Sequence, residues 1–221
     1  MRAITSAIAL SLFAASAAQG QIINGNFESG FVLASGHGYT PAPWTSTNPG
    51  NIFTSFDTWD SSSANGLPPA TNNVFTGVVA AEGNRWAGGW NFEEMYQQMG
   101  FALTPNQQYT ISALVHAGNS ALNFGPGGWE FGLDSAPTAT PTIVAQFAPT
   151  VTWSQGWVLQ SATFTAPSNA GSLLYFFPRV YPTGGANTYM GIDDIQIRIV
   201  PSPGSLALLG LSGMLLKRRR R

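Results

Sequence analysis

The stretch GIDDIQIRI, residues 191–199, carries the pattern on which the fold prediction rests. Three isoleucines recur at every second position and therefore share one face of a β-strand: Ile195, Ile197 and Ile199. Ile192 is out of phase with them, so the strand must change face at the acidic pair that follows it. A β-bulge would make that change and would redirect Asp193. The alternative is that Ile192 packs on the opposite face of the sheet and that no bulge exists.

Upstream segments repeat the period of two and predict further strands. Their alternating apolar positions are Tyr109, Ile111, Ala113 and Val115; Val158, Ala162 and Phe164; and Leu173, Tyr175 and Phe177. Proline, glycine and asparagine turns separate these segments, and no long stretch keeps an apolar period of 3.6 residues. Short strands and turns over about 180 residues predict an all-β fold, a two-sheet β-sandwich of jelly-roll type.

The N-terminal residues 1–20 have the composition of a secretory signal peptide. Arg2 precedes an apolar stretch over 4–14, and small residues follow it at 15–18. This order predicts export through the Sec translocon. Cleavage after Ala18 or after Gly20 fits the pattern; we expect Gly20, so that the domain is predicted to cover residues 21–199. The alternative is a buried N-terminal helix.

The C-terminal residues 200–221 form a tail of three unlike pieces. A proline turn comes first, a thirteen-residue apolar run over 204–216 follows, and a basic block ends the chain. The turn and the block consist of Pro201, Ser202 and Pro203, then Lys217, Arg218, Arg219, Arg220 and Arg221. As a helix the apolar run would reach about 20 Å, short of the ~30 Å hydrocarbon core. Because the arginines favour the cytoplasmic side, everything before residue 200 is expected outside the inner membrane.

This tail resembles the PEP-CTERM sorting signal of Gram-negative bacteria. The resemblance implies that an exosortase-type enzyme processes the tail and that the domain reaches the cell surface or the extracellular matrix. Ser202 departs from the pattern, because that family usually carries Glu between the two prolines. The alternative is a short transmembrane tail that anchors the chain in the inner membrane and is never cut.

The charge of the predicted domain excludes several classes of partner. Residues 21–200 contain all ten acidic residues against three arginines and no lysine, a net charge of about −7. Nucleic acid and anionic lipid both attract cationic surfaces, so neither is expected as a partner. The chain has no cysteine, which excludes disulfides, thiolate nucleophiles and cysteine metal sites.

Five pieces of the domain follow one another in a set order: IINGNFE (22–28), Trp44, AEGNR (81–85), LTPNQQYT (103–110) and GIDDI (191–195). In this order they resemble carbohydrate-binding modules of the family 4/9 and 22 group, which have a galactose-binding-like jelly roll. The resemblance implies a structural calcium ion that ties the first strand, the Glu-Gly-Asn loop and the last strand together. Its ligands would be the carbonyls of Asn26 and Arg85 and the carboxylates of Glu28, Glu82 and Asp193. Calcium prefers such hard oxygen ligands; the alternative is that these acids are ordinary turn and strand-end residues.

Aromatic residues are the candidates for ligand contacts. Sugar-binding modules stack pyranose rings on Trp or Tyr, with polar side chains around the ring. The candidates, which lie near glycines and acidic or amide side chains, are Trp86, Trp90, Tyr96 and Trp129. A cleft built from them would bind extracellular polysaccharide, and burial in the core is the alternative for each tryptophan.

Catalysis is not expected from the sequence. Adjacent Glu93 and Glu94 would point to opposite faces of a strand and could not flank one glycosidic bond, although Glu94 could pair with Glu130 or Asp134. No nucleophile elbow occurs. We therefore expect an exported, non-catalytic matrix protein with a calcium-stabilised module that associates with polysaccharide. A structural envelope or biofilm protein without a defined sugar ligand is the alternative, and a polysaccharide hydrolase is a third.

Overall fold

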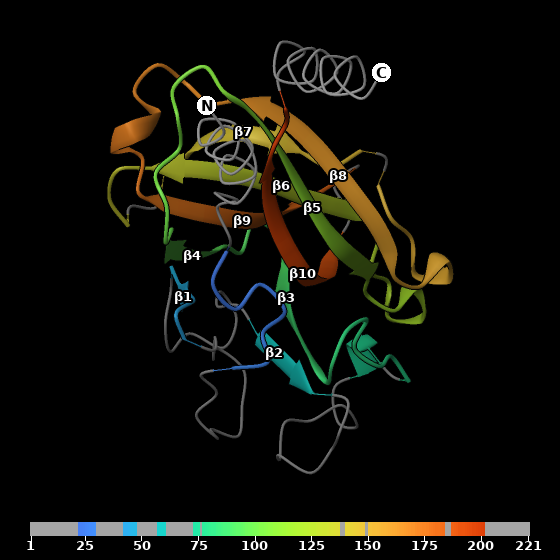
Figure 1. Ribbon diagram of the computed structural model, residues 1–221. Coiled ribbons are helices and arrows are strands. Elements are labelled where there is room, and N and C mark those ends of the chain that lie inside the picture. The colour runs from blue at the N-terminus through green and yellow to red at the C-terminus, as the bar shows by residue number, and fades with distance from the viewer. Residues whose placement is uncertain are drawn as a thin grey trace, which may run out of the picture.

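The computed structural model describes residues 22–29, 42–47, 57–60, 73–75, 77–137, 140–148, 150–183 and 187–201 (Figure 1). The predicted signal peptide and the sorting tail beyond Pro201 lie outside these residues. In the part that is described, no helix is long and apolar enough to cross a membrane.

The described residues form ten strands and four short 3-10 helices. The strands are β1 (Thr45–Ser46), β2 (Asp57–Asp60), β3 (Arg85–Trp90), β4 (Met95–Gln98), β5 (Gln108–Ala117), β6 (Gly127–Asp134), β7 (Thr142–Gln146), β8 (Val158–Thr165), β9 (Tyr175–Pro182) and β10 (Tyr189–Ile199). The 3-10 helices are η2 (Asn73–Phe75), η3 (Ser120–Leu122), η4 (Trp153–Gln155) and η5 (Ala170–Ser172).

The strands form two antiparallel sheets of five strands each. We name the sheet with the order β1-β4-β9-β6-β7 the first sheet, and the sheet with the order β2-β3-β10-β5-β8 the second sheet. They pack face to face, as Figure 1 shows. The prediction of an all-β, two-sheet sandwich is confirmed, and β10, the last strand in the chain, lies in the middle of its sheet.

Alternation places the main core between the sheets. In β5 the side chains that the period of two predicts are buried in this core, namely Tyr109, Ile111, Ala113 and Val115. In β9 the predicted face is wrong: Phe176 and Val180 lie in the inter-sheet core, so Tyr175 and Phe177 lie on the outer face. This strand has large side chains on both faces, so its apolar pattern does not identify the inner one.

The bulge predicted in the last strand is present. The pairing of β10 with β5 shifts register between Asp193 and Gln196, and Asp194 has a φ of 48°. Because of this shift, Ile192 joins Ile195 and Ile197 in the same core, where each side chain is at most 2% exposed. The carboxylate of Asp193 thereby lies near Glu28, in the segment over 22–29 that we call the first segment.

Candidate functional site

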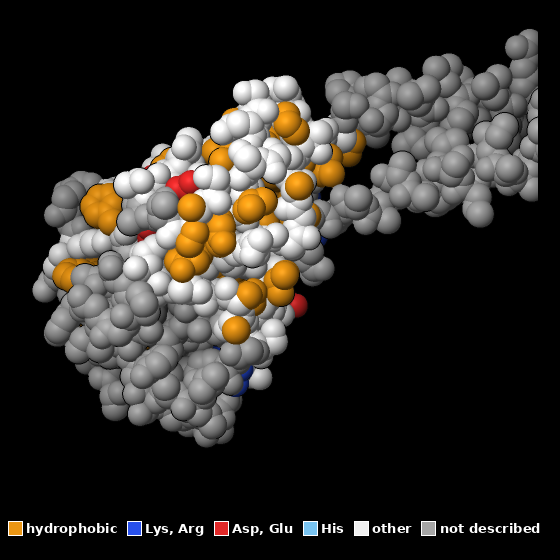
Figure 2. Space-filling view, turned by 90° about the vertical axis from the view of Figure 1, so that its left-hand side faces the viewer, with side chains coloured by type: hydrophobic (Ala, Val, Ile, Leu, Met, Phe, Trp, Pro, Cys, Tyr) orange, Lys and Arg blue, Asp and Glu red, His pale blue; other side chains and the backbone are white. Residues whose placement is uncertain are grey.

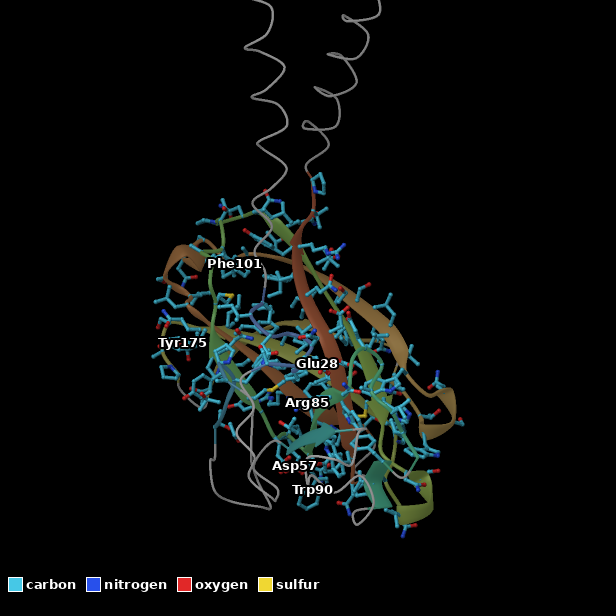
Figure 3. All side chains as sticks on the ribbon, turned by 60° about the horizontal axis from the view of Figure 1, so that its bottom comes forward. Glu28, Asp57, Arg85, Trp90, Phe101 and Tyr175 are labelled. Atoms are coloured by element: carbon cyan, nitrogen blue, oxygen red, sulfur yellow. The ribbon has the colours of Figure 1, made fainter. Side chains whose placement is uncertain are left out.

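Residues 22–29, the Glu-Gly-Asn loop over 81–85 and the bulge of β10 lie next to one another. Glu28 Oε1 accepts hydrogen bonds from the backbone N–H groups of Asn84 and Arg85, both at 2.6 Å. Arg85 in turn donates from its guanidinium to the carbonyl of Glu28 at 3.2 Å, and Figure 3 shows the two residues side by side. Gly83 has a φ of +64°, and a Cβ there would lie 2.5 Å from Glu28 Oε1. Only glycine therefore lets the loop close on this carboxylate.

Asp193 joins the same junction from the bulge and is fully buried. Its carboxylate oxygens accept hydrogen bonds from the backbone N–H groups of Glu82, at 3.0 Å, and Asp194, at 2.8 Å. Burial raises the pKa of Asp193 to about 7, and the nearby carboxylates of Asp194 and Glu28 add to the increase. Asp193 and Glu28 are thus two carboxylates that approach each other across three chain segments.

The junction provides part of the ligand set expected for calcium. Glu28 and Asp193 each offer a carboxylate, and both carboxylates accept hydrogen bonds from backbone N–H groups of the Glu-Gly-Asn loop. Glu82 was expected to contribute its carboxylate. The residue is exposed, and the hydrogen bond described for it runs from its backbone N–H to Asp193. Within the described ranges, no three acidic or histidine side chains are close enough together to hold a metal ion. Carbonyls and waters would therefore have to complete the six to eight oxygen ligands that calcium takes.

The four aromatic candidates do not form one cleft. Trp129 is fully buried between the sheets, where its indole N–H donates to the carbonyl of Gly191 at 3.2 Å. Trp86 is also fully buried, but on the outer face of the second sheet, packed against Trp59 and Phe75. Both assignments as ligand contacts are corrected, because a ring without exposed area cannot stack on a sugar.

Trp90 and Tyr96 are half-buried and lie apart. Trp90 borders the aromatic cluster on the second sheet. Tyr96 lies on the outer face of the first sheet, with ring centroids 6.0 Å from Tyr175 and 5.5 Å from Phe177. Tyr96 thus packs against the half-buried ring of Tyr175 and the buried ring of Phe177.

A row of charged residues crosses the first sheet next to Tyr96. Arg179 lies between Glu94 and Glu130 in the strand register. Its guanidinium donates to Glu130 Oε1 from both Nε and an NH2 group at 2.5 Å. We call Glu94, Arg179 and Glu130 the charged row. Glu94 and Glu130 are one of the acid pairs that the sequence allows for glycosidic-bond cleavage. The structure places these two acids on either side of one arginine.

Glu94 is the unusual member of the charged row. It is 5% exposed, and its Oε2 atom is buried without a hydrogen-bond partner. Burial raises the pKa of Glu94 to about 7; Arg179 opposes the increase and Glu130 adds to it. Glu94 thus holds a proton near neutral pH beside a carboxylate already paired with an arginine. A pair of this kind can donate and accept hydrogen bonds from hydroxyl groups and can move a proton.

Aromatic rings border the charged row along β9. Tyr175 lies on one side, beside Tyr96, and Tyr181 lies on the other. The Tyr181 ring covers Gly128, where a Cβ would lie 2.7 Å from it, and its hydroxyl donates to the carbonyl of Phe147 at 2.7 Å. We call the charged row together with Tyr96, Tyr175 and Tyr181 the β9 face. Figure 2 shows the side of the molecule that carries β1 and β4, where apolar side chains lie among neutral polar atoms with few charged groups.

A second buried acid network lies at the other sheet. Tyr189 donates a short hydrogen bond to Asp57, and Glu93 Oε2 accepts from the backbone N–H of Trp90 at 2.6 Å. Burial raises the pKa of Glu93 to about 8, with a further increase from Asp57. Figure 3 shows Asp57 and Trp90 together at the end of the sandwich away from Phe101. This network is enclosed by aromatic rings, so we assign it a structural role.

No family model matches the sequence, and no curated protein matches it. Two solved cyclase structures from Fischerella sp. TAU are similar to the chain. A Stig cyclase in complex with (3Z)-3-(1-methyl-2-pyrrolidinylidene)-3H-indole is 15% identical, with a TM-score of 0.56 over 83% of this chain and 98% of that one. A cyclase in complex with 4-(1H-indol-3-yl)butan-2-one is 16% identical, with a TM-score of 0.57 over 84% and 99%.

These neighbours overturn the expectation that the chain is not an enzyme, because enzymes are built on this fold. The expectation rested on the lack of a glycosidase acid pair and of a nucleophile elbow. A cyclase needs neither, since ring closure adds no water and requires no acyl intermediate. The sequence patterns thus excluded some hydrolases and not catalysis as such.

Carbohydrate-binding jelly rolls are also among the similar structures. TmCBM61 in complex with beta-1,4-galactotriose is 13% identical, with a TM-score of 0.46 over 82% of this chain and 99% of that one. At identities this low, the likenesses show the fold alone. The chain is an all-β protein whose two-sheet fold is similar to that of the cyclases.

Proposed function

We propose that the chain is an exported polysaccharide-binding protein whose ligand site is the β9 face. One observation carries this proposal: the Arg179–Glu130 ion pair lies beside the unpartnered oxygen of Glu94, and tyrosine rings lie on both sides of this group.

The chemistry of the β9 face suits a sugar chain. A pyranose ring presents C–H groups to the negative face of an aromatic ring, and its hydroxyls need donors and acceptors at the rim. Tyr96 and Tyr175 provide half-buried rings, while Arg179 and Glu130 provide charge-assisted hydrogen bonds.

Replacing Tyr96 or Tyr175 with alanine is expected to weaken polysaccharide binding about tenfold, because each change removes one stacking ring worth about 1–1.5 kcal/mol. Affinity electrophoresis against a panel that includes xylan and a β-1,4-linked galactan measures the effect. Tyr96→Phe keeps the ring and should bind like the wild type. Leu159→Ala is the matched surface control, since Leu159 is 69% exposed on β8 of the other sheet. Equal retardation of Tyr96→Ala and Leu159→Ala would refute the assignment of this face.

We also propose that calcium stabilises the junction of Glu28, Asp193 and the Glu-Gly-Asn loop. A ligand that binds only the native state stabilises it by about 2.7 kcal/mol at a hundredfold excess over its Kd. The unfolding midpoint should therefore be several degrees higher in calcium than in EGTA. Asp193→Asn should remove this difference, and magnesium should not replace calcium, because it demands a stricter geometry. Identical unfolding midpoints in calcium and EGTA would contradict the calcium proposal and would mean that hydrogen bonds alone hold the junction together.

We infer the export route from the sequences of the two termini. The signal peptide would direct the chain to the Sec translocon, and an exosortase-type enzyme would process the tail around Pro201, Ser202 and Pro203. The domain would then reach the cell surface or the matrix, where polysaccharide is present. The intact mass of the secreted protein reports both cuts, and a full-length mass would refute the processing.

A further inference from the structure

The turn that joins β3 to β4 presents an aromatic ring in an unfavourable backbone conformation. Phe92 has a φ of 59°, and its side chain is 59% exposed. Asn91 before it also has a positive φ, 27°. Asparagine and glycine are the usual residues at such positions, and a bulky side chain with this φ is a true outlier. The ring thus gains little from burial to offset its backbone strain.

Hydrogen bonds to both sheets hold the turn in this conformation. Asn91 donates its backbone N–H to the carbonyl of Thr188 at 3.0 Å and accepts the Thr188 N–H on Oδ1 at 2.8 Å. Phe92 donates its N–H to the carbonyl of Val180, also at 3.0 Å. The backbone path is therefore fixed by its neighbours rather than by the phenyl ring. A glycine at position 92 would keep every one of these bonds and remove the strain.

The position of Phe92 connects it to the β9 face. Val180, to which it is bonded, lies between Arg179 and Tyr181, and Glu94 follows Phe92 by two residues. Tyr175 lies at the other end of β9, six residues before Tyr181, a distance of about 20 Å at the rise of a strand. Rings are thus present on both sides of the charged row along β9, and Phe92 is more exposed than Tyr181 on its side.

We propose that Phe92 is the terminal aromatic contact for the ligand, so that the β9 face binds an extended sugar chain rather than a single sugar. This inference rests on the proposed function. A strained and exposed ring is retained where glycine would suit the backbone better, and local strain of this kind accompanies binding sites. The charged row then contacts the middle of the chain, with Tyr96 and Tyr175 at one end and Phe92 at the other.

The test compares Phe92→Gly with the wild type, using the full-length protein. The unfolding midpoint should rise by about 2–4 °C, because a strained residue is replaced by one that accepts a positive φ. Affinity for xylan or β-1,4-galactan should fall about fivefold to tenfold, whereas the response to free xylose or galactose should not change. Phe92→Tyr keeps the ring and should retain the wild-type affinity for the polymer.

Val79→Ala is the matched control, because Val79 is an apolar side chain that is 64% exposed and lies away from the β9 face, in the segment between η2 and β3. It should leave polymer affinity unchanged. If Phe92→Gly binds the polymer as tightly as the wild type does, the inference is refuted and the proposed function stands. An equal loss for polymer and monosaccharide would refute the extended site. A wild-type protein that binds no polymer would refute the proposed function and this inference together.

Discussion

Gly25→Ala should lower the free energy of unfolding by about 3 kcal/mol or more. Gly25 is buried against the bulge of β10, and a Cβ there would lie 2.2 Å from the carbonyl oxygen of Ile195. That oxygen belongs to the backbone, and Ile195 also donates its N–H to the carbonyl of Gly25 at 3.0 Å. A methyl group can be accommodated only if the first segment moves off the strand, and such overpacking costs several kcal/mol at close backbone contacts.

Gly171→Ala provides the matched control for this substitution. Gly171 lies in η5 with no atom within 4 Å of a Cβ added to it. Urea unfolding followed by tryptophan fluorescence should give a midpoint near the wild-type value for Gly171→Ala and a much lower one for Gly25→Ala. If the two variants were equally stable, the contact between the first segment and β10 would contribute little to the fold.

Glu93→Gln should stabilise the protein at alkaline pH and have little effect near pH 5. The pKa of Glu93 rises from 4.5 to about 8 on folding, chiefly because the side chain is buried. Between these values the native state binds more protons than the unfolded state, so the stability of the wild type falls as pH rises from about 4.5 to about 8. Glutamine stays neutral and can still accept the N–H of Trp90. At pH 9 the variant should be more stable by about 3–5 kcal/mol.

Unfolding free energies of both proteins from pH 5 to pH 9 test this expectation. The other buried acids titrate in both proteins, so the difference between the two curves isolates Glu93. Glu94→Gln provides a comparison: burial raises the pKa of that residue only to about 7, so its difference from the wild type should also begin near pH 4.5 but stop growing near pH 7. Parallel curves for the wild type and Glu93→Gln would show that Glu93 ionises as readily in the folded protein as in the unfolded chain.

Patterns within a single strand predicted the features that depend on that strand alone. The alternation in β5 predicted its buried face, and the change of phase in β10 predicted the bulge. Both patterns are visible within ten residues of sequence. The meeting of Glu28, Arg85 and Asp193 came from the order of family motifs rather than from any local pattern. The structure brings Glu28 into contact with the loop, and the calcium site stays a prediction.

The candidate site depends on pairings that no local pattern contains. Glu94, Glu130 and Arg179 are far apart in sequence and become neighbours only through the strand order of the first sheet. Burial of Trp86 and Trp129 likewise follows from which sheet face each strand presents, and both faces of this sandwich carry aromatic side chains. A positive φ at Phe92 is also invisible in the sequence, since a phenylalanine does not indicate it.

The central place of β10 has a consequence for how the molecule folds. It hydrogen-bonds to β3 on one side and to β5 on the other, and Gly25 near the start of the domain bonds to its bulge. The second sheet therefore cannot close until the final segment has been synthesised. Pairings between such distant positions make folding slow, because a long loop must close before contacts form. A nascent chain that stops before residue 189 is expected to remain open to proteases, and folding should begin only after the whole domain is free.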